Sequence, residues 1–228
     1  MRKALIALTL LFAGLTGCAP DLTNLDELSE IEFVPPAGKG RVVVVLSGSS
    51  GSGNYLFAGR DLAAQGYYVV LHNGNNFPRR NPGTHEVLRK AITRAQASPH
   101  AIPGKVGVVG YSMGGGAIVG HISAMPDLVA VAVAYYPVTV LPDHDDIARD
   151  WVVPTLALMG ESDPMQPVRI DAFRAMAEPA RRHGADIELV TYPGTGHDFN
   201  WAAGGAQQPA TDDAWRRTLA ALRQHLGT

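Results

Sequence analysis

The stretch GYSMG, residues 110–114, places the hydroxyl of Ser112 between two glycines at the end of an apolar run. The run itself is typical of a buried strand, and the small residues that follow are typical of a helix. A serine in such a tight turn takes strained backbone angles, and glycines two residues away on either side avoid collisions there. The pattern predicts a nucleophile at a helix N-terminus, where developing negative charge is stabilised. The plainer alternative is a glycine-rich turn with a capping serine.

A serine hydroxyl attacks a carbonyl efficiently only when a base takes its proton and an acid orients that base. His197 follows the last predicted strand, on a turn that contains two glycines. Asp163 follows the strand that ends at Gly160. The chain order Ser112, Asp163, His197 is the order of the α/β-hydrolase arrangement and of no other common serine-hydrolase fold. We therefore expect these three side chains to form a catalytic triad.

Other residues of the same types compete for the roles of base and acid. His72 also follows a strand, whereas the remaining competing histidines lie on predicted helices, where a packed or solvated role is the default. Glu161 shares the turn of Asp163, and three aspartates follow the preceding strand. Asp198 comes directly after the proposed base, and we expect it to point elsewhere and to be structural. These competing residues on helices and on the earlier turn are His85, His121, His183, His225, Asp143, Asp145 and Asp146.

Two backbone N–H groups are needed to bind the oxyanion that forms during acyl transfer. The first is expected from Met113, directly after the nucleophile. The second is expected from Ser49, in the glycine-rich loop that follows the first long strand. A phosphate-binding loop is the competing interpretation, but no GK[ST] follows and the GxGxxG spacing is absent.

These residues require a scaffold of alternating strands and helices. Long apolar, β-branched runs predict strands buried on both faces, and amphipathic stretches between them predict helices. Such alternation favours a mostly parallel sheet covered by helices on both faces, an α/β fold in which functional residues gather at the carboxyl ends of the strands. The expected strands span 41–48, 67–74, 105–110, 129–137, 154–160 and 186–194, and the expected helices span 55–66, 84–97, 113–125, 168–184 and 212–226.

Residues near these strand ends are candidates for a substrate pocket. Arg79 or Arg80 could bind a substrate carboxylate, although arginines in loops are more often solvated. The other candidates are polar or aromatic residues that leave strands or flank the proposed triad: Tyr55, Asn75, Phe77, Tyr136 and Trp201.

Several motifs together resemble the α/β-hydrolase superfamily, and within it most closely the dienelactone hydrolase family. They are VVGYSMGGG, AYYP, GESDPMQP, TYPGTGHDFNW and the final DDAWRRTLAALRQHL. The resemblance implies an α/β-hydrolase fold without a separate cap domain, metal or cofactor. This chain differs from the name-giving enzymes of the family at two places. Those enzymes use a cysteine nucleophile where this chain has Ser112, and they carry a His-Glu pair where it has Ser47-Gly48. We therefore do not carry their dienelactone substrate over to this chain.

The N-terminus has the layout of an export signal, with Arg2 and Lys3 before an apolar stretch too short to span a bilayer comfortably. The sequence LTGC, which ends at Cys18, resembles the bacterial lipoprotein box. We expect residues 1–17 to be a signal peptide, 18–30 a lipidated cysteine and polar tether, and 31–228 the hydrolase domain. The protein would then be exported and held on a membrane. An ordinary secretory signal is the alternative.

Composition narrows the function further. A length of 228 residues with 46% hydrophobic residues favours a single domain with a large core. The formal net charge of -2 gives no basic field that would attract nucleic acid. Cys18 is the only cysteine, so no internal disulfide can form. The leading hypothesis is a serine hydrolase acting on a small-molecule or polymeric carboxylic ester. A peptidase or thioesterase on the same triad, and a non-catalytic binding lipoprotein with this fold, are the alternatives, and the oligomeric state is not indicated.

Overall fold

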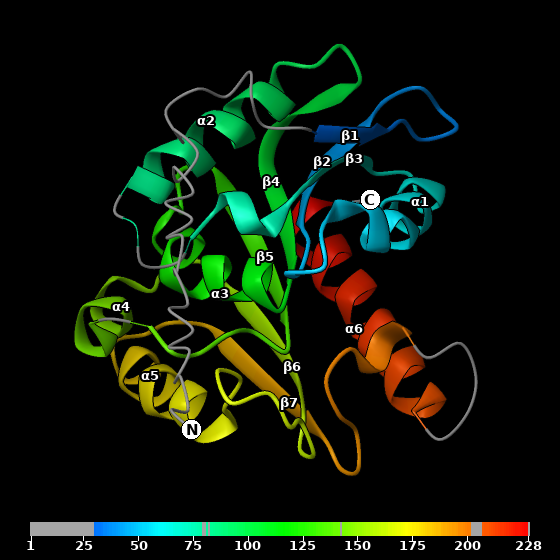
Figure 1. The fold of residues 1–228 in the computed structure, drawn as a ribbon. Coiled ribbons are helices and arrows are strands. Elements are labelled where there is room, and N and C mark those ends of the chain that lie inside the picture. Colours follow the sequence, from blue (N-terminus) through cyan, green and yellow to red (C-terminus); the bar gives the residue numbers. More distant parts are fainter. Residues whose placement is uncertain (1–29, 79–80, 82, 142, 202–206, 228) are drawn as a thin grey trace, which may run out of the picture.

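The computed structural model describes residues 30–78, 81, 83–141, 143–201 and 207–227 (Figure 1). The predicted signal peptide, Cys18 as the predicted lipidation site, the predicted tether up to residue 29, and Arg79 and Arg80 lie outside the described residues. The side chain of Trp201 also lies outside the described part.

Seven strands form one sheet in the order β1-β3-β2-β4-β5-β6-β7. Every neighbouring pair is parallel except β1 and β3, which are antiparallel. The mostly parallel sheet that was predicted from the alternation of strands and helices is therefore confirmed. The strands are β1 (Glu30–Phe33), β2 (Gly40–Leu46), β3 (Tyr68–His72), β4 (Ala101–Tyr111), β5 (Val129–Tyr135), β6 (Thr155–Gly160) and β7 (Ile187–Tyr192).

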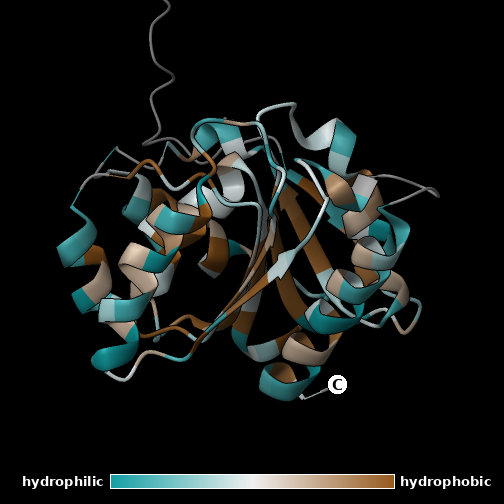
Figure 2. Ribbon diagram, turned by 90° about the horizontal axis from the view of Figure 1, so that it is seen from below, coloured by the Kyte–Doolittle hydropathy of each residue, from teal (hydrophilic) through white to brown (hydrophobic). Residues whose placement is uncertain are grey.

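Helices cover both faces of this sheet. In Figure 1, α1 and α6 lie on one side of the strands and α2, α3, α4 and α5 on the other, and Figure 2 shows the apolar strands enclosed between the two helical layers. The helices are α1 (Leu56–Ala64), α2 (Gly83–Gln96), α3 (Met113–Gly120), α4 (His144–Asp150), α5 (Ile170–Arg182) and α6 (Gln208–Leu226).

Strand β2 shows why the central strands are apolar without interruption. Val43 and Val45 belong to one buried cluster, whereas Val42, Val44 and Leu46 belong to a second cluster. Successive side chains of a strand point to opposite faces, so a strand covered on both sides needs an apolar residue at every position. These two clusters hold the sheet rigid beneath the loops at its carboxyl edge.

Three differences from the sequence-based expectation concern short elements. Strand β1 and helix α4 were not predicted, and the helix expected over 113–125 ends at Gly120, followed by a 3₁₀ turn at Ile122–Ala124. Helix α4 lies between β5 and β6 and has only seven residues.

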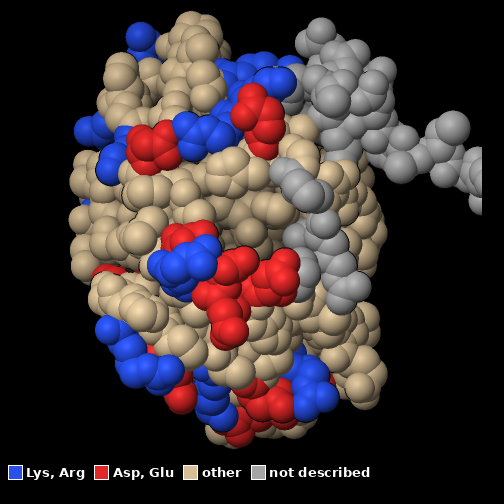
Figure 3. Space-filling view, turned by 90° about the vertical axis from the view of Figure 1, so that its left-hand side faces the viewer, with Lys and Arg blue, Asp and Glu red and all other residues tan. Residues whose placement is uncertain are grey.

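Opposite charges lie next to one another on the face that carries α2, α4 and α5 (Figure 3). Arg89 pairs with Asp127, and Arg149 pairs with Asp146 and Asp150. Such exposed pairs contribute little stability each, but they leave the described part of this face without an extended patch of one sign. Within the described ranges, no helix combines the length and apolarity needed to cross a membrane.

Candidate active site

Ser112 lies at the turn between β4 and α3. Its φ of 51° and ψ of -106° are strained angles for a residue with a Cβ atom. The turn is fixed by the Ser112 N–H, which donates to the carbonyl of Tyr135 at 3.0 Å, and by the Ser112 carbonyl, which accepts from the N–H of Gly116 at 2.9 Å. The backbone thus holds the hydroxyl of Ser112 at the first turn of a helix, as the motif predicts.

The glycines of the motif permit close backbone contacts around this turn. A Cβ atom at Gly110 would lie 2.5 Å from the carbonyl oxygen of Gly114, and one at Gly114 would lie 2.3 Å from the carbonyl oxygen of Leu46. Both distances are far below normal contact. The strained serine turn therefore depends on two positions that admit no side chain.

Three side chains from distant parts of the sequence meet at the carboxyl edge of the sheet. Nε2 of His197 lies 3.1 Å from Oγ of Ser112, and Nδ1 of His197 lies 2.7 Å from Oδ2 of Asp163. The other carboxylate oxygen of Asp163 accepts from the N–H of Met165 at 2.9 Å. The side chains of His197 and Asp163 are 13% and 4% exposed, so little water competes for these bonds. This geometry can carry a proton from the hydroxyl to the imidazole.

The competing acids and histidines lie elsewhere. Glu161 is exposed and accepts from the hydroxyl of Thr191, and Asp145 and Asp146 are exposed on α4. His72 is fully buried at the end of β3, where its ring packs edge-on against Phe77. Burial, followed by the charge of Arg94, lowers the pKa of His72 to about 4. His72 is therefore a core residue of the sheet and is not in contact with Ser112.

The loop after β2 is held next to the serine turn. The carbonyl of Ser47 accepts from the N–H of Gly114 at 3.2 Å, and Oγ of Ser47 accepts from the N–H of Gly74 at 3.0 Å. The carbonyl of Ser49 accepts from Nδ2 of Asn75 at 2.9 Å. Asn75, expected in the substrate pocket, thus supports the backbone of the loop that was predicted to supply one oxyanion N–H. The N–H of Met113 lies in the first turn of α3.

Tyr55 and Tyr136 form an aromatic wall beside the triad. The ring of Tyr136 lies 4.5 Å from the ring of His197, and its hydroxyl donates to Oδ1 of Asn200 at 2.5 Å. A Cβ atom at Gly48 would lie 2.2 Å from the hydroxyl of Tyr55 and 3.3 Å from Cβ of Ser112. Burial raises the pKa of Tyr55 to about 12 and raises that of Tyr136 well above its usual value. Both hydroxyls therefore stay neutral at physiological pH and can donate hydrogen bonds.

The expectation for Asp198 was wrong, because its carboxylate lies at the site and does not point away. Oδ1 of Asp198 lies 3.8 Å from Nε2 of His197, the same nitrogen that faces Ser112. The negative charge of Asp198 also contributes, after burial, to the raised pKa of Tyr55. A left-handed φ of 54° at Asp198 turns the chain back toward the triad. Aspartate is among the non-glycine residues that adopt such an angle most often, but its presence alone does not predict this turn.

Phe77 does not occupy the expected position in a pocket. It is completely buried in the cluster that contains β2, α2 and α3 residues, and it packs against His72. Sequence position after a strand suggested an open pocket, but the short 3₁₀ turn Gly74–Asn76 directs the chain back into the core. Phe77 is therefore a structural residue beneath the loop that carries Asn75.

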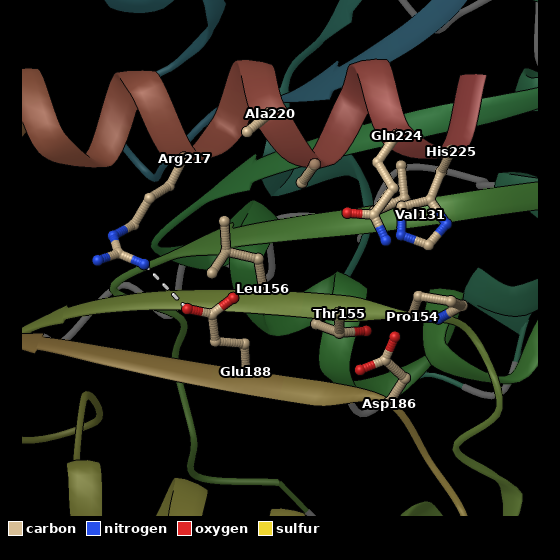
Figure 4. A pocket seen from close by; sticks show the side chains of 11 residues that line it. Val131, Pro154, Thr155, Leu156, Asp186, Glu188, Arg217, Ala220, Gln224 and His225 are labelled. Carbon is tan, nitrogen blue, oxygen red and sulfur yellow. Dashed lines mark hydrogen bonds and ion pairs between the residues drawn. The ribbon is translucent and has the colours of Figure 1, made fainter. Parts of the chain in front are cut away.

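A polar hollow of about 240 Å³ lies at the opposite edge of the sheet (Figure 4). Thr155 begins β6 and Asp186 precedes β7, so this hollow lies at the amino ends of the strands. Arg217 of α6 bonds to Glu188 across it at 3.0 Å. Ser112, Asp163 and His197 meet at the carboxyl ends, so the hollow is separate from the candidate active site.

Residues 76–226 match the dienelactone hydrolase family. A candidate carboxymethylenebutenolidase of Yersinia pestis is 30% identical over 176 residues, covering 71% of this chain and 63% of that protein. Protein usf of Aquifex pyrophilus is 25% identical over 152 residues, covering 66% of this chain and 64% of that protein. The matched region thus spans less than two thirds of the length of either relative.

The fold is shared with solved structures. A candidate dienelactone hydrolase from Klebsiella pneumoniae superposes with a TM-score of 0.67 over 86% of this chain and 99% of that one. At 21% sequence identity the likeness concerns the fold alone. The α/β-hydrolase fold that the motifs implied is confirmed by this match.

Proposed function

Because the chain belongs to the dienelactone hydrolase family, we propose that it is a serine hydrolase that cleaves a carboxylic ester through an acyl-enzyme on Ser112. The observation that carries the proposal is the hydrogen-bonded series from Ser112 through His197 to Asp163. A binding protein has no need of all three side chains in contact, so this series favours an enzyme over a non-catalytic surface protein.

The reaction proceeds in two halves. Oγ of Ser112 attacks the ester carbonyl while Nε2 of His197 accepts its proton, and Asp163 accepts a hydrogen bond from Nδ1–H and stabilises the imidazolium. The oxyanion accepts hydrogen bonds from the N–H groups of Met113 and Ser49. Collapse of the intermediate breaks the bond to the alcohol, which leaves with the proton from His197. A water molecule then repeats the sequence and releases the acid.

The serine nucleophile and the absence of a His-Glu pair after β2 distinguish this chain from the name-giving enzymes of the family. Ser47 uses its hydroxyl to hold Gly74, and Gly48 leaves room for the hydroxyl of Tyr55. Neither residue can replace a glutamate that interacts with the nucleophile. This supports an ester substrate other than a dienelactone.

Labelling with a fluorophosphonate probe tests the nucleophile. We expect the purified protein to be labelled on Ser112, because the probe reacts with serines that an adjacent histidine activates. Ser112→Ala should abolish the label and reduce ester hydrolysis at least about 10³-fold. Ser98→Ala removes a hydroxyl far from the triad, whose role is to accept from the N–H of His100, and should leave both unchanged. Labelling that survives in Ser112→Ala would contradict the proposal.

The bond that is cleaved is tested with three substrates that share one acyl group. An ester, a thioester and an amide differ only in the leaving group, and we expect kcat/KM to be highest for the ester. Faster hydrolysis of the thioester or the amide would replace the ester assignment with a thioesterase or peptidase, while leaving the nucleophile unaffected.

We also propose that the protein is exported and attached to a membrane through Cys18, and the LTGC sequence supports this. The test is fractionation of bacteria that express the full chain and are fed a labelled fatty acid. We expect the chain to carry the label and to sediment with membranes. Cys18→Ser should lose the label and leave the membrane fraction, and label on the Cys18→Ser protein would contradict the proposal.

A further inference from the structure

A second cavity, of about 170 Å³, lies on the face of the sheet that α1 and α6 cover. Phe57 and Asp61 of α1 line one side, and Asp212 and Trp215 of α6 line the other. The two helices are joined further along by a hydrogen bond from Arg223 to Gln65 at 2.9 Å. A cavity of this size admits a ligand roughly as large as benzene, since an engineered cavity of about 150 Å³ binds that molecule.

The floor of this cavity contains Tyr111, whose hydroxyl has no hydrogen-bond partner among the described residues. Tyr111 is 1% exposed, and its ring is fixed by stacking on Tyr135 at 4.8 Å. Its side chain lines the cavity, so the hydroxyl opens into it. A buried polar group without a partner costs free energy unless a ligand or water satisfies it. The hydroxyl of Tyr111 is therefore available to a ligand or a water molecule in the cavity.

The charge around the cavity is negative. Asp61 and Asp212 both line it, and the described residues that line it include no lysine, arginine or histidine. Burial raises the pKa of Asp61, with Arg60 of the same helix acting against this. Asp61 also adds, after burial and the neighbouring tyrosines, to the raised pKa of Tyr111, so its charge lies close to the hydroxyl. An anionic occupant would meet two carboxylates and is disfavoured.

The remaining walls are aromatic. The rings of Phe57 and Tyr111 are 6.2 Å apart in an edge-to-face arrangement, and Trp215 lies on the opposite helix. Aromatic faces attract cations through their quadrupole, and indole and phenol rings do so more strongly than benzene rings. Carboxylates and aromatic rings around one small cavity are the combination that recognises alkylammonium groups.

We propose that this cavity binds a small organic cation, with the carboxylates of Asp61 and Asp212 and the aromatic wall of Tyr111, Phe57 and Trp215 surrounding its ammonium group. The hydroxyl of Tyr111 accepts a hydrogen bond from an N–H donor, or from a hydroxyl carried by the same ligand. The proposal is independent of the ester hydrolysis proposed above, because it rests on none of the triad residues.

Calorimetric titration of the full-length protein with choline chloride tests this. The reference ligand is 3,3-dimethyl-1-butanol, which has the shape of choline without its charge. We expect saturable binding of choline and at least about fivefold weaker binding of the alcohol, because loss of a charge at this range is worth about that factor. Equal affinity for the two ligands, or no binding of choline, would overturn the proposal without any substitution being made.

Substitutions then locate the site. Asp61→Asn and Asp212→Asn should each weaken choline binding about fivefold, whereas Asp145→Asn removes an equal charge from exposed α4 and should leave it unchanged. The cation would bind elsewhere if Asp145→Asn weakened choline binding as much as the two cavity variants do. The same conclusion would follow if Asp61→Asn left both the affinity for choline and the Tm unchanged. Repeating the titration on Ser112→Ala should give the same affinity, which separates this site from failure of the proposed hydrolase.

Discussion

Asp198 is the residue at the site that changes what substrates should be expected. Its carboxylate is 40% exposed and lies 3.8 Å from the nitrogen of His197 that faces Ser112. An ester bound at Ser112, as proposed, would lie close to this charge. A negatively charged ester is therefore disfavoured relative to a neutral one of the same shape.

Replacing Asp198 tests this charge selection. In Asp198→Asn, we expect the ratio of kcat/KM for an anionic ester to that for its neutral analogue to rise about fivefold, which corresponds to about 1 kcal/mol of partly screened repulsion. The rise should shrink in high salt, because salt screens exposed charges. Steady-state kinetics on the two esters measure both effects. Asp145→Asn, on the exposed surface of α4, is the control, and an unchanged ratio in Asp198→Asn would show that substrates do not approach this carboxylate.

At the residue scale, sequence reasoning worked where strand ends and chain order decide the outcome. Ser112, Asp163 and His197 each follow a strand that the apolar pattern predicts, and parallel strands bring their carboxyl ends to one edge. It did not work where a single backbone angle decides the direction of a side chain. Asp198 turns toward the triad through a left-handed φ, and Phe77 turns into the core after a 3₁₀ turn.

At the scale of elements, the long buried strands were predictable and two short elements were not. Strand β1 has only four residues, EIEF, and its polar positions resemble a loop. Helix α4 has seven residues, of which Ala148 alone is buried. Neither is long enough for apolar periodicity to distinguish it, so their formation depends on packing against neighbours such as β3.

The serine turn depends on a close contact between α3 and β2, and one substitution can test it. Gly114→Ala would place a Cβ atom 2.3 Å from the carbonyl oxygen of Leu46 in β2. We expect the free energy of unfolding to fall by about 2–3 kcal/mol, because backbone atoms in a packed core cannot move aside cheaply. Urea unfolding measures the change. Gly53→Ala, where no atom lies within 4 Å, is the matched control and should change stability by less than about 0.5 kcal/mol. Equal effects of the two substitutions would refute the proposed contact.

For the whole molecule, the buried His72 links stability to pH. Its pKa of about 4 lies below the ordinary value near 6.5 because burial disfavours the charged ring. Between these values the unfolded chain binds a proton that the folded chain does not, so stability falls as pH falls from about 6.5 to 4. The total loss amounts to about 3 kcal/mol.

Removing the imidazole tests this link. When the pH falls from 7 to 4.5, the free energy of unfolding should decrease in both proteins, and the decrease should be about 2–3 kcal/mol smaller in His72→Leu than in the unsubstituted protein. The reason is that the variant has no imidazole that takes up a proton on unfolding. Urea unfolding at the two pH values gives the difference. His183→Leu removes an exposed ring at the end of α5 and serves as the control. If His72→Leu and the parent protein lose equal stability, the acid sensitivity belongs to other groups.

The antiparallel strand β1 has a consequence for where the enzyme would work. Glu30 pairs with His72, at the carboxyl end of β3, and is level with Leu46 of β2, which in turn pairs with Gly110 two residues before the nucleophile. The chain therefore enters its folded body on the catalytic side. The twelve residues from Cys18 to Ser29 reach at most about 40 Å when extended. If Cys18 carries a lipid, as proposed, the candidate active site would lie on the side of the domain where the tether attaches, within about this distance of the bilayer.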